Sequence, residues 1–368
     1  MERIVLAYSG SLVTSVAIPW LAERYGAHVI AVTLDLGQGP ELEAVRDRAL
    51  ATGALRAHVL DVREQFARDY VLPALKAGAV DADGHPMAAA LSRPLIASKL
   101  IEIAGIEQAT AVAHGGTSLG DDQEQLEVAA HALNAAMPVF APARDWGMTR
   151  SDVMSYAQSH HLALPPDADR PYTIDCNLWG RSIASDGTAR PRPEDLFVLT
   201  KAPAHCPDEP ASIEITFDRG APTAINGVAM PFLDLVGSLG IIVAAHGVGR
   251  IALADGPPGG RASFALCEAP AAVVLHAAHR ALQAGVTPKD LERRCRETSL
   301  AYAGLITRGE WFGPVRAALD AAVVATGQRV SGVVRLTLFK GTCRVETATQ
   351  GSEALSMNRG YSVCADRP

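Results

Sequence analysis

The sequence predicts an α/β protein, in which an N-terminal domain with a parallel sheet is followed by an α+β domain. Short apolar runs alternate with helical segments over residues 1–164, which is typical of a parallel sheet with helices on both faces. A Ser/Gly turn directly follows the first apolar run, at the strand end where such sheets bind ligands. After a proline-rich connector at 165–171 the segments become short and alternating, so a second domain is expected over 165–368.

The elements of the first domain follow from their periodicity and from their end signals. Strands are expected at 4–7, 29–34, 57–60, 109–113 and 138–142, and helices at 16–25, 41–52, 91–104 and 121–133. Gly26 and Gly53 follow two of the helices as caps, and Pro94 falls in the first turn of another.

The turn after the first strand predicts an anion site. Backbone N–H groups at a helix start, together with the positive end of the helix dipole, bind anions. Ser9, Ser11, Thr14 and Ser15 add hydroxyl donors. The turn has neither the Gly-Lys-Ser/Thr ending of a Walker A loop nor a Gly-x-Gly-x-x-Gly pattern.

The second domain reads as hairpins and helices. A strand at 213–217 precedes turn signals at 220–222 and 225–227, and 333–345 reads as another hairpin around Lys340-Gly341. Helices are expected at 270–283 and 314–326, which gives an α+β domain.

Composition and charge indicate which binding partners and which cellular compartment to expect. The net charge of −7 gives no general attraction to nucleic acid or to anionic membranes. Six scattered cysteines without a CxxC pair argue against a zinc site or disulfide framework and suit a reducing compartment. We therefore expect a cytoplasmic protein that binds neither nucleic acid nor membrane and has no resident metal site.

Several longer stretches carry a resemblance to one family. They are Leu6–Gly10, Asp35–Gly39, Leu91–Ala97, Ala113–Gly115, Asp122–Gln123, Pro171–Asp175, Asn177–Ser182 and His246–Ile251. In order and spacing the chain resembles the argininosuccinate synthases, which belong to the adenine-nucleotide α-hydrolases.

The resemblance implies a ligase that forms a carbon–nitrogen bond with ATP and Mg2+. A ureido oxygen of citrulline attacks the α-phosphorus of ATP, pyrophosphate leaves, the amine of aspartate attacks the activated carbon, and AMP departs. It also implies small-molecule substrates and a homo-oligomer, a dimer or tetramer, here with a shortened C-terminus.

The resemblance also implies a set of nucleotide contacts. They are Ala7, Tyr8, Ser9, Gly10, Ser11, Thr14, Ser15, Ala31, Gln38 and Gly115. Two positions depart from the family loop Ser-Gly-Gly-Leu-Asp-Thr-Ser. Ser11 replaces the second Gly, which suits a close approach or a positive φ, and Val13 replaces the Asp.

The implied substrate residues depart further from the family. Arg93, Thr117 and Asp122 are the implied catalytic residues. The substrate pocket comprises His85, Ala89, Thr117, Asp121, Asp122, Gln125, Thr173, Ser182, Asp255 and Cys267. Gln125 replaces an Arg that grips a carboxylate, and Asp121 adds a negative charge one turn away. Cys267 reads as a small buried hydrophobe rather than a nucleophile.

Three hypotheses follow. The favoured one is a ligase of this type whose acceptor is not free citrulline but a compound without a free carboxylate. The alternatives are a genuine argininosuccinate synthase and a non-catalytic nucleotide-binding paralogue.

Overall fold

A computed structural model describes residues 2–116, 122–165, 168, 170–185, 193–253, 264–351, 353–355 and 362–364. The chain forms two compact units. The first comprises Met1–Arg63, Ala90–Arg170 and Ile306–Gly313, and the second comprises Glu64–Ala89, Pro171–Leu305 and Pro314–Pro368. A parallel sheet in the first unit and antiparallel sheets in the second confirm the predicted α/β class. The domain boundary between residues 164 and 165 stays a prediction.

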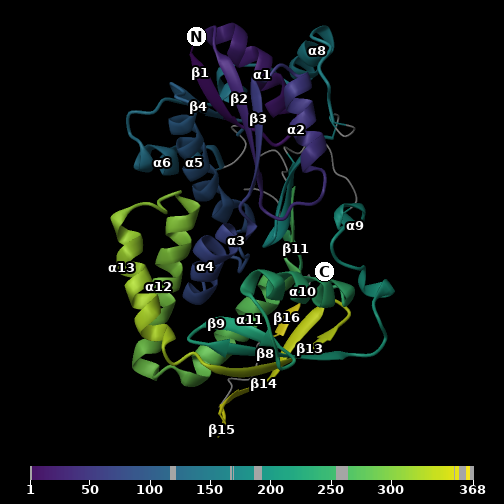
Figure 1. The fold of residues 1–368 in the computed structure, drawn as a ribbon. Helices are drawn as coiled ribbons and strands as arrows, with labels where there is room; N and C mark the ends of the chain where they lie inside the picture. The colour runs from purple at the N-terminus through teal and green to yellow at the C-terminus, as the bar shows by residue number, and fades with distance from the viewer. Residues whose placement is uncertain are drawn as a thin grey trace, which may run out of the picture. The chain divides into compact units, whose positions relative to one another are not determined.

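The first unit is built on a five-stranded sheet in which every pairing is parallel (Figure 1). The strands in spatial order are β3 (Arg56–Asp61), β2 (His28–Asp35), β1 (Arg3–Ala7), β4 (Ala111–His114) and β5 (Val139–Phe140). The strands β1 and β4 are buried on both sides, which explains their continuous apolar sequences.

The helices of the first unit include the four that were predicted, α1 (Leu12–Tyr25), α2 (Leu42–Ala51), α5 (Ala88–Ile106) and α6 (Asp122–Leu133). Two more, α7 (Pro142–Asp145) and α8 (Arg150–Ser159), were not predicted. One expectation was wrong. The helix α5 begins at Ala88, so Pro94 lies inside it and not in its first turn. The helix thus extends about one turn further toward its N-terminus than the apolar pattern indicated.

The sheet order places a ligand crevice at a defined strand edge. From β1 the chain moves to β2 on one side of the sheet, and later it returns to β4 on the other side. The loops that leave the carboxyl ends of β1 and β4 therefore diverge. In open α/β sheets this is the edge where ligands bind.

The second unit contains two antiparallel sheets. One has the order β10-β9-β8-β13-β14-β15, with β16 also paired to β14, and the other has the order β11-β12-β7-β6. The strands are β6 (Tyr172–Asn177), β7 (Gly180–Ser185), β8 (Ala211–Asp218), β9 (Ala221–Ile225), β10 (Val228–Ala229), β11 (Arg250–Leu253), β12 (Phe264–Glu268), β13 (Gly332–Phe339), β14 (Thr342–Gln350), β15 (Glu353–Ala354) and β16 (Ser362–Cys364).

The hairpin turns read from the sequence are present. Asn226 and Gly227 adopt φ angles of 50° and 77° between β9 and β10. Lys340 and Gly341 adopt 41° and 88° between β13 and β14. Two successive positive φ angles match the right-handed twist of the flanking strands, so these turns fix the strand register.

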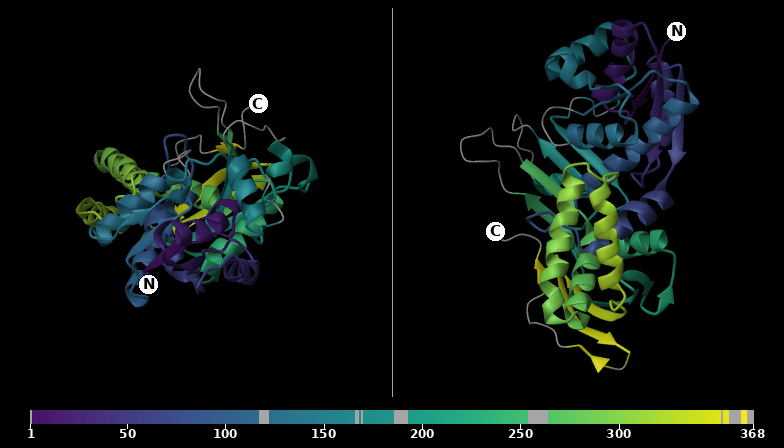
Figure 2. Two further views of the ribbon diagram at one scale, coloured as in Figure 1. Left: turned by 90° about the horizontal axis from the view of Figure 1, so that it is seen from above. Right: turned by 90° about the vertical axis from the view of Figure 1, so that its left-hand side faces the viewer.

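The second unit has more helices than the sequence indicated. The remaining helical segments of the chain are α3 (Arg63–Phe66), η1 (Ala67–Val71), α4 (Leu72–Ala77), α9 (Pro193–Leu196), η2 (Pro203–His205), α10 (Phe232–Ala245), α11 (Pro270–Val286), α12 (Lys289–Thr307) and α13 (Pro314–Gly327). The unpredicted α12 lies beside α13 in both views (Figures 1 and 2), and Tyr302 Oη donates to Asp320 Oδ1 at 2.9 Å. Among the described residues, no helix has the length and apolar content needed to cross a membrane.

The core helix α11 buries two histidines. The ring centroid of His276 lies 5.8 Å from that of Trp179, and the ring of His279 lies 5.9 Å from that of Phe217. Neither Nε2 atom has a hydrogen-bond partner within the described part of the chain. Burial lowers the pKa of His276 to about 3 and that of His279 to about 4, so both are neutral at pH 7.

We expect these histidines to make the protein sensitive to acid. Below a pH of about 6.5 the two histidines bind protons in the unfolded chain but stay neutral in the folded protein. The free energy of unfolding therefore falls as the pH falls toward the folded pKa values. Each ring should cost about 2 kcal/mol at a pH of about 5. His279→Leu should reduce the loss of unfolding free energy between these pH values, measured with urea at each pH. Since each protein is compared with itself, the packing cost cancels, and an unchanged pH dependence would contradict this account.

Candidate active site

The loop that joins β1 to α1 carries a cluster of hydroxyl groups. Ser9 Oγ lies 3.1 Å from Ser11 Oγ and 3.2 Å from Thr14 Oγ1, and the last two atoms are also 3.2 Å apart. We call Ser9, Ser11 and Thr14 the hydroxyl cluster. Ser11 is the N-cap of α1 and accepts from the Thr14 N–H. Three hydroxyls thus gather at the positive end of a 14-residue helix, where an anion is stabilised.

The departure at Ser11 does not strain this loop. Ser11 has φ −70° and ψ 167°, a conformation open to any residue. Of the two reasons given for a glycine at this position, a positive φ does not apply, because the turn takes its positive φ, of 78°, at Gly10. A close approach of phosphate to this position stays a prediction. The Ser side chain then gains a role, since its oxygen caps the helix.

Tyr8 ties the loop to the sheet. Its backbone N–H donates to Val32 O at 2.9 Å, and its carbonyl accepts from Thr33 Oγ1 at 2.8 Å. The phenol oxygen lies 3.0 Å from Ser15 Oγ in the first turn of α1. Burial raises the pKa of Tyr8, so the phenol stays protonated and can act as a donor. Both ends of the loop are thereby fixed to buried elements.

The turn after β4 lies against the start of α1. A methyl group added at Gly115 would lie within 3.0 Å of Thr14 Cγ2 and 3.8 Å from Val13 Cγ1. Two segments that the sequence analysis assigned separately to the nucleotide therefore touch each other. Only glycine leaves room for this approach.

A buried histidine supports the same turn. The Gly116 N–H donates to His114 Nδ1 at 3.1 Å, which leaves the ring proton on Nε2 in the neutral tautomer. That Nε2 lies 3.4 Å from Glu127 Oε1, and Arg144 Nη1 donates to the same oxygen at 2.9 Å. The contact with His114, with help from Gln123 and Arg144, lowers the pKa of Glu127 to about 2. His114 lies in one of the family stretches, but no role was predicted for it.

Other implied nucleotide residues occupy different surroundings. Ala7 is half-buried at the end of β1, and Ala31 lies in the core of β2 with 1% of its surface exposed. The Gln38 amide folds back on its own turn, where it accepts from Leu36 N and donates to Leu34 O, both at 2.6 Å. Contacts of these residues with a nucleotide stay predictions.

Gln125 serves a contact within the first unit. Its Nε2 donates to Thr307 O at 3.0 Å, and only 4% of the residue is exposed. Gly309 packs so closely on the Gln125 backbone that a side chain there would collide with it. The amide oxygen has no hydrogen-bond partner among the described residues. Arg93 is half-buried on α5. Roles for Gln125 and Arg93 toward a substrate stay predictions.

Four predicted residues cannot be placed in the same way. Thr117, Asp121 and Asp255 lie outside the described residues. Asp122 is the first residue of α6, but its side chain is not among the parts of the chain that the structure describes.

In the second unit, one face of a sheet gathers three of the predicted substrate residues. Ser182 on β7 pairs directly with Asp175 on β6 and with Cys267 on β12. Cross-strand partners project to the same face, and Thr173 joins them because it lies two residues from Asp175. Cys267 is buried, and burial raises its pKa to about 12, so its thiol is protonated at neutral pH. This is consistent with the small buried hydrophobe that was predicted.

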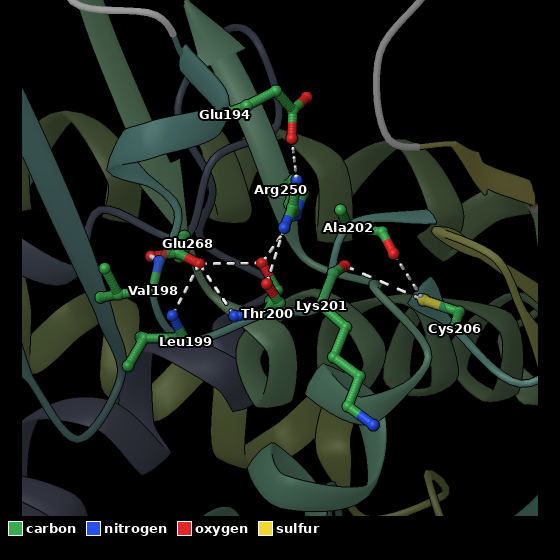
Figure 3. Close-up of polar contacts among 9 residues, drawn as sticks. All are labelled: Glu194, Val198, Leu199, Thr200, Lys201, Ala202, Cys206, Arg250 and Glu268. Atoms are coloured by element: carbon green, nitrogen blue, oxygen red, sulfur yellow. Dashed lines mark hydrogen bonds and ion pairs between the residues drawn. The ribbon is translucent and has the colours of Figure 1, made fainter. Parts of the chain in front are cut away.

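The other face of these strands holds a buried carboxylate (Figure 3). Glu268 is 1% exposed and accepts from the N–H groups of Leu199 and Thr200 and from Thr200 Oγ1 at 2.8–3.0 Å. It also accepts from Val198 N at 3.0 Å and from Arg181 Nη1 at 3.3 Å. The carboxylate thus fixes the 198–200 segment to the strands that carry Ser182 and Cys267.

A buried guanidinium completes this arrangement. Arg250 donates through Nε to Thr200 Oγ1 at 2.9 Å and through Nη2 to Thr200 O at 2.6 Å. Its Nη1 reaches the exposed Glu194 at 2.9 Å, and the group lies 4.5 Å from the centre of the Phe197 ring. The two family stretches 177–182 and 246–251 therefore supply buried cations that attach the 194–200 segment to the sheet.

A short turn contains the remaining predicted residues. His85 is buried, and its Nδ1 lies 2.7 Å from Asp81 Oδ2. Ala89 follows on the first turn of α5. Among the described residues, one group could hold a cation, since ligand atoms of Asp81, Asp83 and His85 lie within 4.8 Å of one another. Hydrogen bonds inside the turn already use Asp81, because its Oδ1 accepts from the N–H groups of Asp83 and His85.

Family models match both parts of the chain. The arginosuccinate synthase N-terminal HUP domain matches residues 3–163, and the arginosuccinate synthase C-terminal domain matches residues 172–359. The chain belongs to the argininosuccinate synthase family. The resemblance seen in the sequence is thereby confirmed, and the protein is an ATP-dependent ligase of argininosuccinate synthase type.

Individual members of the argininosuccinate synthase family are similar over most of their length. The argininosuccinate synthase of Rubrobacter xylanophilus is 44% identical over 94% of this chain and 85% of its own. Those of Brevibacillus brevis and Gloeobacter violaceus are also 44% identical, over 96% and 94% of this chain and 85% and 87% of their own.

Proposed function

We propose that the protein catalyses the argininosuccinate synthase reaction, which joins citrulline and aspartate at the expense of ATP. The observation that carries this proposal is similarity to argininosuccinate synthases at 44% identity over 94% of the chain. The β1–α1 loop supports it, because its hydroxyl cluster and helix start suit a polyphosphate.

The reaction has two substitution steps. The ureido oxygen of citrulline attacks the α-phosphorus of ATP, and the bond from that phosphorus to the bridging oxygen breaks, so pyrophosphate leaves with the electron pair. The amine of aspartate then attacks the activated ureido carbon and loses a proton. The bond from that carbon to the AMP oxygen breaks, and AMP departs.

The first unit would hold the nucleotide. The hydroxyl cluster and the N–H groups at the start of α1 bind phosphate oxygens, and the α1 dipole favours their negative charge. A Mg2+ ion bound with ATP would supply positive charge that stabilises the leaving pyrophosphate. The loop offers hydroxyl oxygens as ligands, but Val13 supplies no carboxylate where the family has Asp. The residues therefore fit a cation that arrives bound to ATP. Ser9, Ser11 and Thr14 would share its coordination with the phosphates.

An altered acceptor is a second candidate. In the family pocket, Gln125 stands in place of an Arg, Ala89 in place of a Thr and Cys267 in place of a Tyr. These replacements remove a guanidinium and two hydroxyls that would contact free amino acids. A loss of that guanidinium favours an acceptor without a free carboxylate. The overall similarity to argininosuccinate synthases nevertheless supports citrulline better. A non-catalytic paralogue is the third possibility and rests on Val13.

The test is a product assay with the full chain. With ATP, Mg2+, citrulline and aspartate, we expect steady formation of argininosuccinate by mass spectrometry and one pyrophosphate per product, and none when citrulline is omitted. Pyrophosphate release only with citrulline amide or another carboxyl-masked acceptor would favour the second candidate. If the protein binds ATP but releases no pyrophosphate with any acceptor, the result would favour the non-catalytic paralogue.

A further inference from the structure

One cation from outside the β1–α1 loop reaches the loop backbone. Arg48, on α2, donates through Nη1 to the Gly10 carbonyl at 3.1 Å. A side chain at Gly10 would lie 2.9 Å from that same Nη1 and 3.1 Å from the methyl groups of Val45. Arg48 and Val45 therefore fill the space next to the Gly10 Cα. Because this residue also has a positive φ, glycine is the residue that fits at this position.

The contact with Arg48 orients one peptide group of the loop. In a planar trans peptide the Gly10 carbonyl and the Ser11 N–H point in opposite directions. The carbonyl meets Arg48, and the Ser11 N–H points to Ser9 Oγ in the hydroxyl cluster, in a long hydrogen bond of 3.4 Å. A phosphate oxygen is a stronger acceptor than a hydroxyl, so this N–H is available to it.

The charge of Arg48 is also available to a ligand. Residues 4–16, which include the loop, contain no Lys or Arg, so the loop brings no cation of its own. Within the described part of the chain, no carboxylate forms an ion pair with Arg48. Its charge acts on the phenol of Tyr8, which carries no negative charge that could compensate it. The positive charge of Arg48 therefore remains uncompensated close to the predicted phosphate site.

We propose that Arg48 is a positioning residue for the phosphates of ATP. By holding the Gly10 carbonyl, it keeps the Ser11 N–H directed at the hydroxyl cluster, and its charge favours the polyphosphate and the departing pyrophosphate. The inference rests on the proposed function for its substrate, ATP. It adds a residue from α2 that lies 38 positions from the loop in the sequence.

The test compares Arg48→Gln with a matched variant on the same helix. Arg46→Gln removes an exposed guanidinium that pairs with its neighbour Asp47 at 2.9 Å. We expect Arg48→Gln to raise the KM for ATP, and to weaken binding of inorganic pyrophosphate with Mg2+ in calorimetry, by about tenfold or more. The KM for citrulline should stay within about twofold. Arg46→Gln should match the native protein, and Arg48→Lys should recover part of the affinity because an ammonium can still donate to the carbonyl.

Three other results would count against the proposal. Unchanged pyrophosphate binding in Arg48→Gln would show that Arg48 does not position the loop for phosphate. Equal losses toward ATP and citrulline, with a lower melting temperature, would make its role structural only. Native protein that binds no pyrophosphate would also overturn the inference. If native protein binds pyrophosphate but does not convert citrulline, the proposed function fails while the calorimetric comparison still decides the role of Arg48.

Discussion

Replacing Glu268 with alanine should lower the free energy of unfolding of the second unit by about 3–5 kcal/mol. The substitution leaves four N–H or O–H donors of the 198–200 segment without their buried acceptor. It also leaves Arg181, whose side chain is only 10% exposed, without its carboxylate. Removing one partner of a buried charge pair costs far more than the pair itself contributes, because the remaining charge stays desolvated.

Hydrogen exchange provides the direct measurement. The backbone N–H groups of Val198, Leu199 and Thr200 donate to Glu268, so their protection should fall in Glu268→Ala more than that of the β8 strand. The matched control is Glu194→Gln, which removes an ion-pair partner of Arg250 that is 68% exposed. Such a pair contributes about 0–1 kcal/mol, so the control should stay near the native protein. Native-like protection at 198–200 in Glu268→Ala would contradict the anchoring role.

Local patterns were sufficient to predict the five strands and four of the helices of the first unit. Strand, turn and helix alternate there within a few residues of one another, and the turn chemistry at Ser9–Ser11 is visible in the sequence itself. The hairpin at Asn226-Gly227 was predictable for the same reason, since two residues with positive φ specify it. In each case the physical cause lies inside the segment that was read.

The missed features depend on partners distant in sequence. Glu268 meets the 198–200 segment at separations of 68–70 residues, and Gln125 meets Thr307 at 182 residues. No local period encodes such contacts. The helix α10 was missed for another reason, because its sequence is apolar almost throughout and includes Gly237 and Gly240, which hides the helical period.

The site shows the same division. The family stretches assigned the β1–α1 loop and the turn after β4 separately to the nucleotide, and the contact of Gly115 with Thr14 shows that the two segments pack against each other. The reading of Gln125 rested on a charge lost relative to the family. The structure shows that a buried amide at this position also has a packing role, which a comparison of charges does not reveal.

A close approach in the first unit gives the second large effect, which we expect from Gly115→Ala. The new methyl group would fall within 3.0 Å of Thr14 Cγ2, and Thr14 is β-branched and buried. Either Thr14 rotates and breaks the hydroxyl cluster, or the turn after β4 moves away from α1. Overpacking of this kind costs about 1–3 kcal/mol, and if the cost falls on the conformation that binds ATP, the KM for ATP should rise by about 5- to 150-fold.

A second substitution in the same contact makes the test selective. Thr14→Ser removes the methyl group that would collide and keeps the hydroxyl, so the double variant Gly115→Ala with Thr14→Ser should recover most of the ATP affinity. Gly105→Ala on α5 is the control, because a methyl group there meets nothing within 4 Å and alanine favours a helix. It should leave the KM for ATP unchanged. If the double variant binds ATP as weakly as Gly115→Ala alone, the collision with Thr14 is not the cause, and the hydroxyl cluster does not depend on the turn after β4.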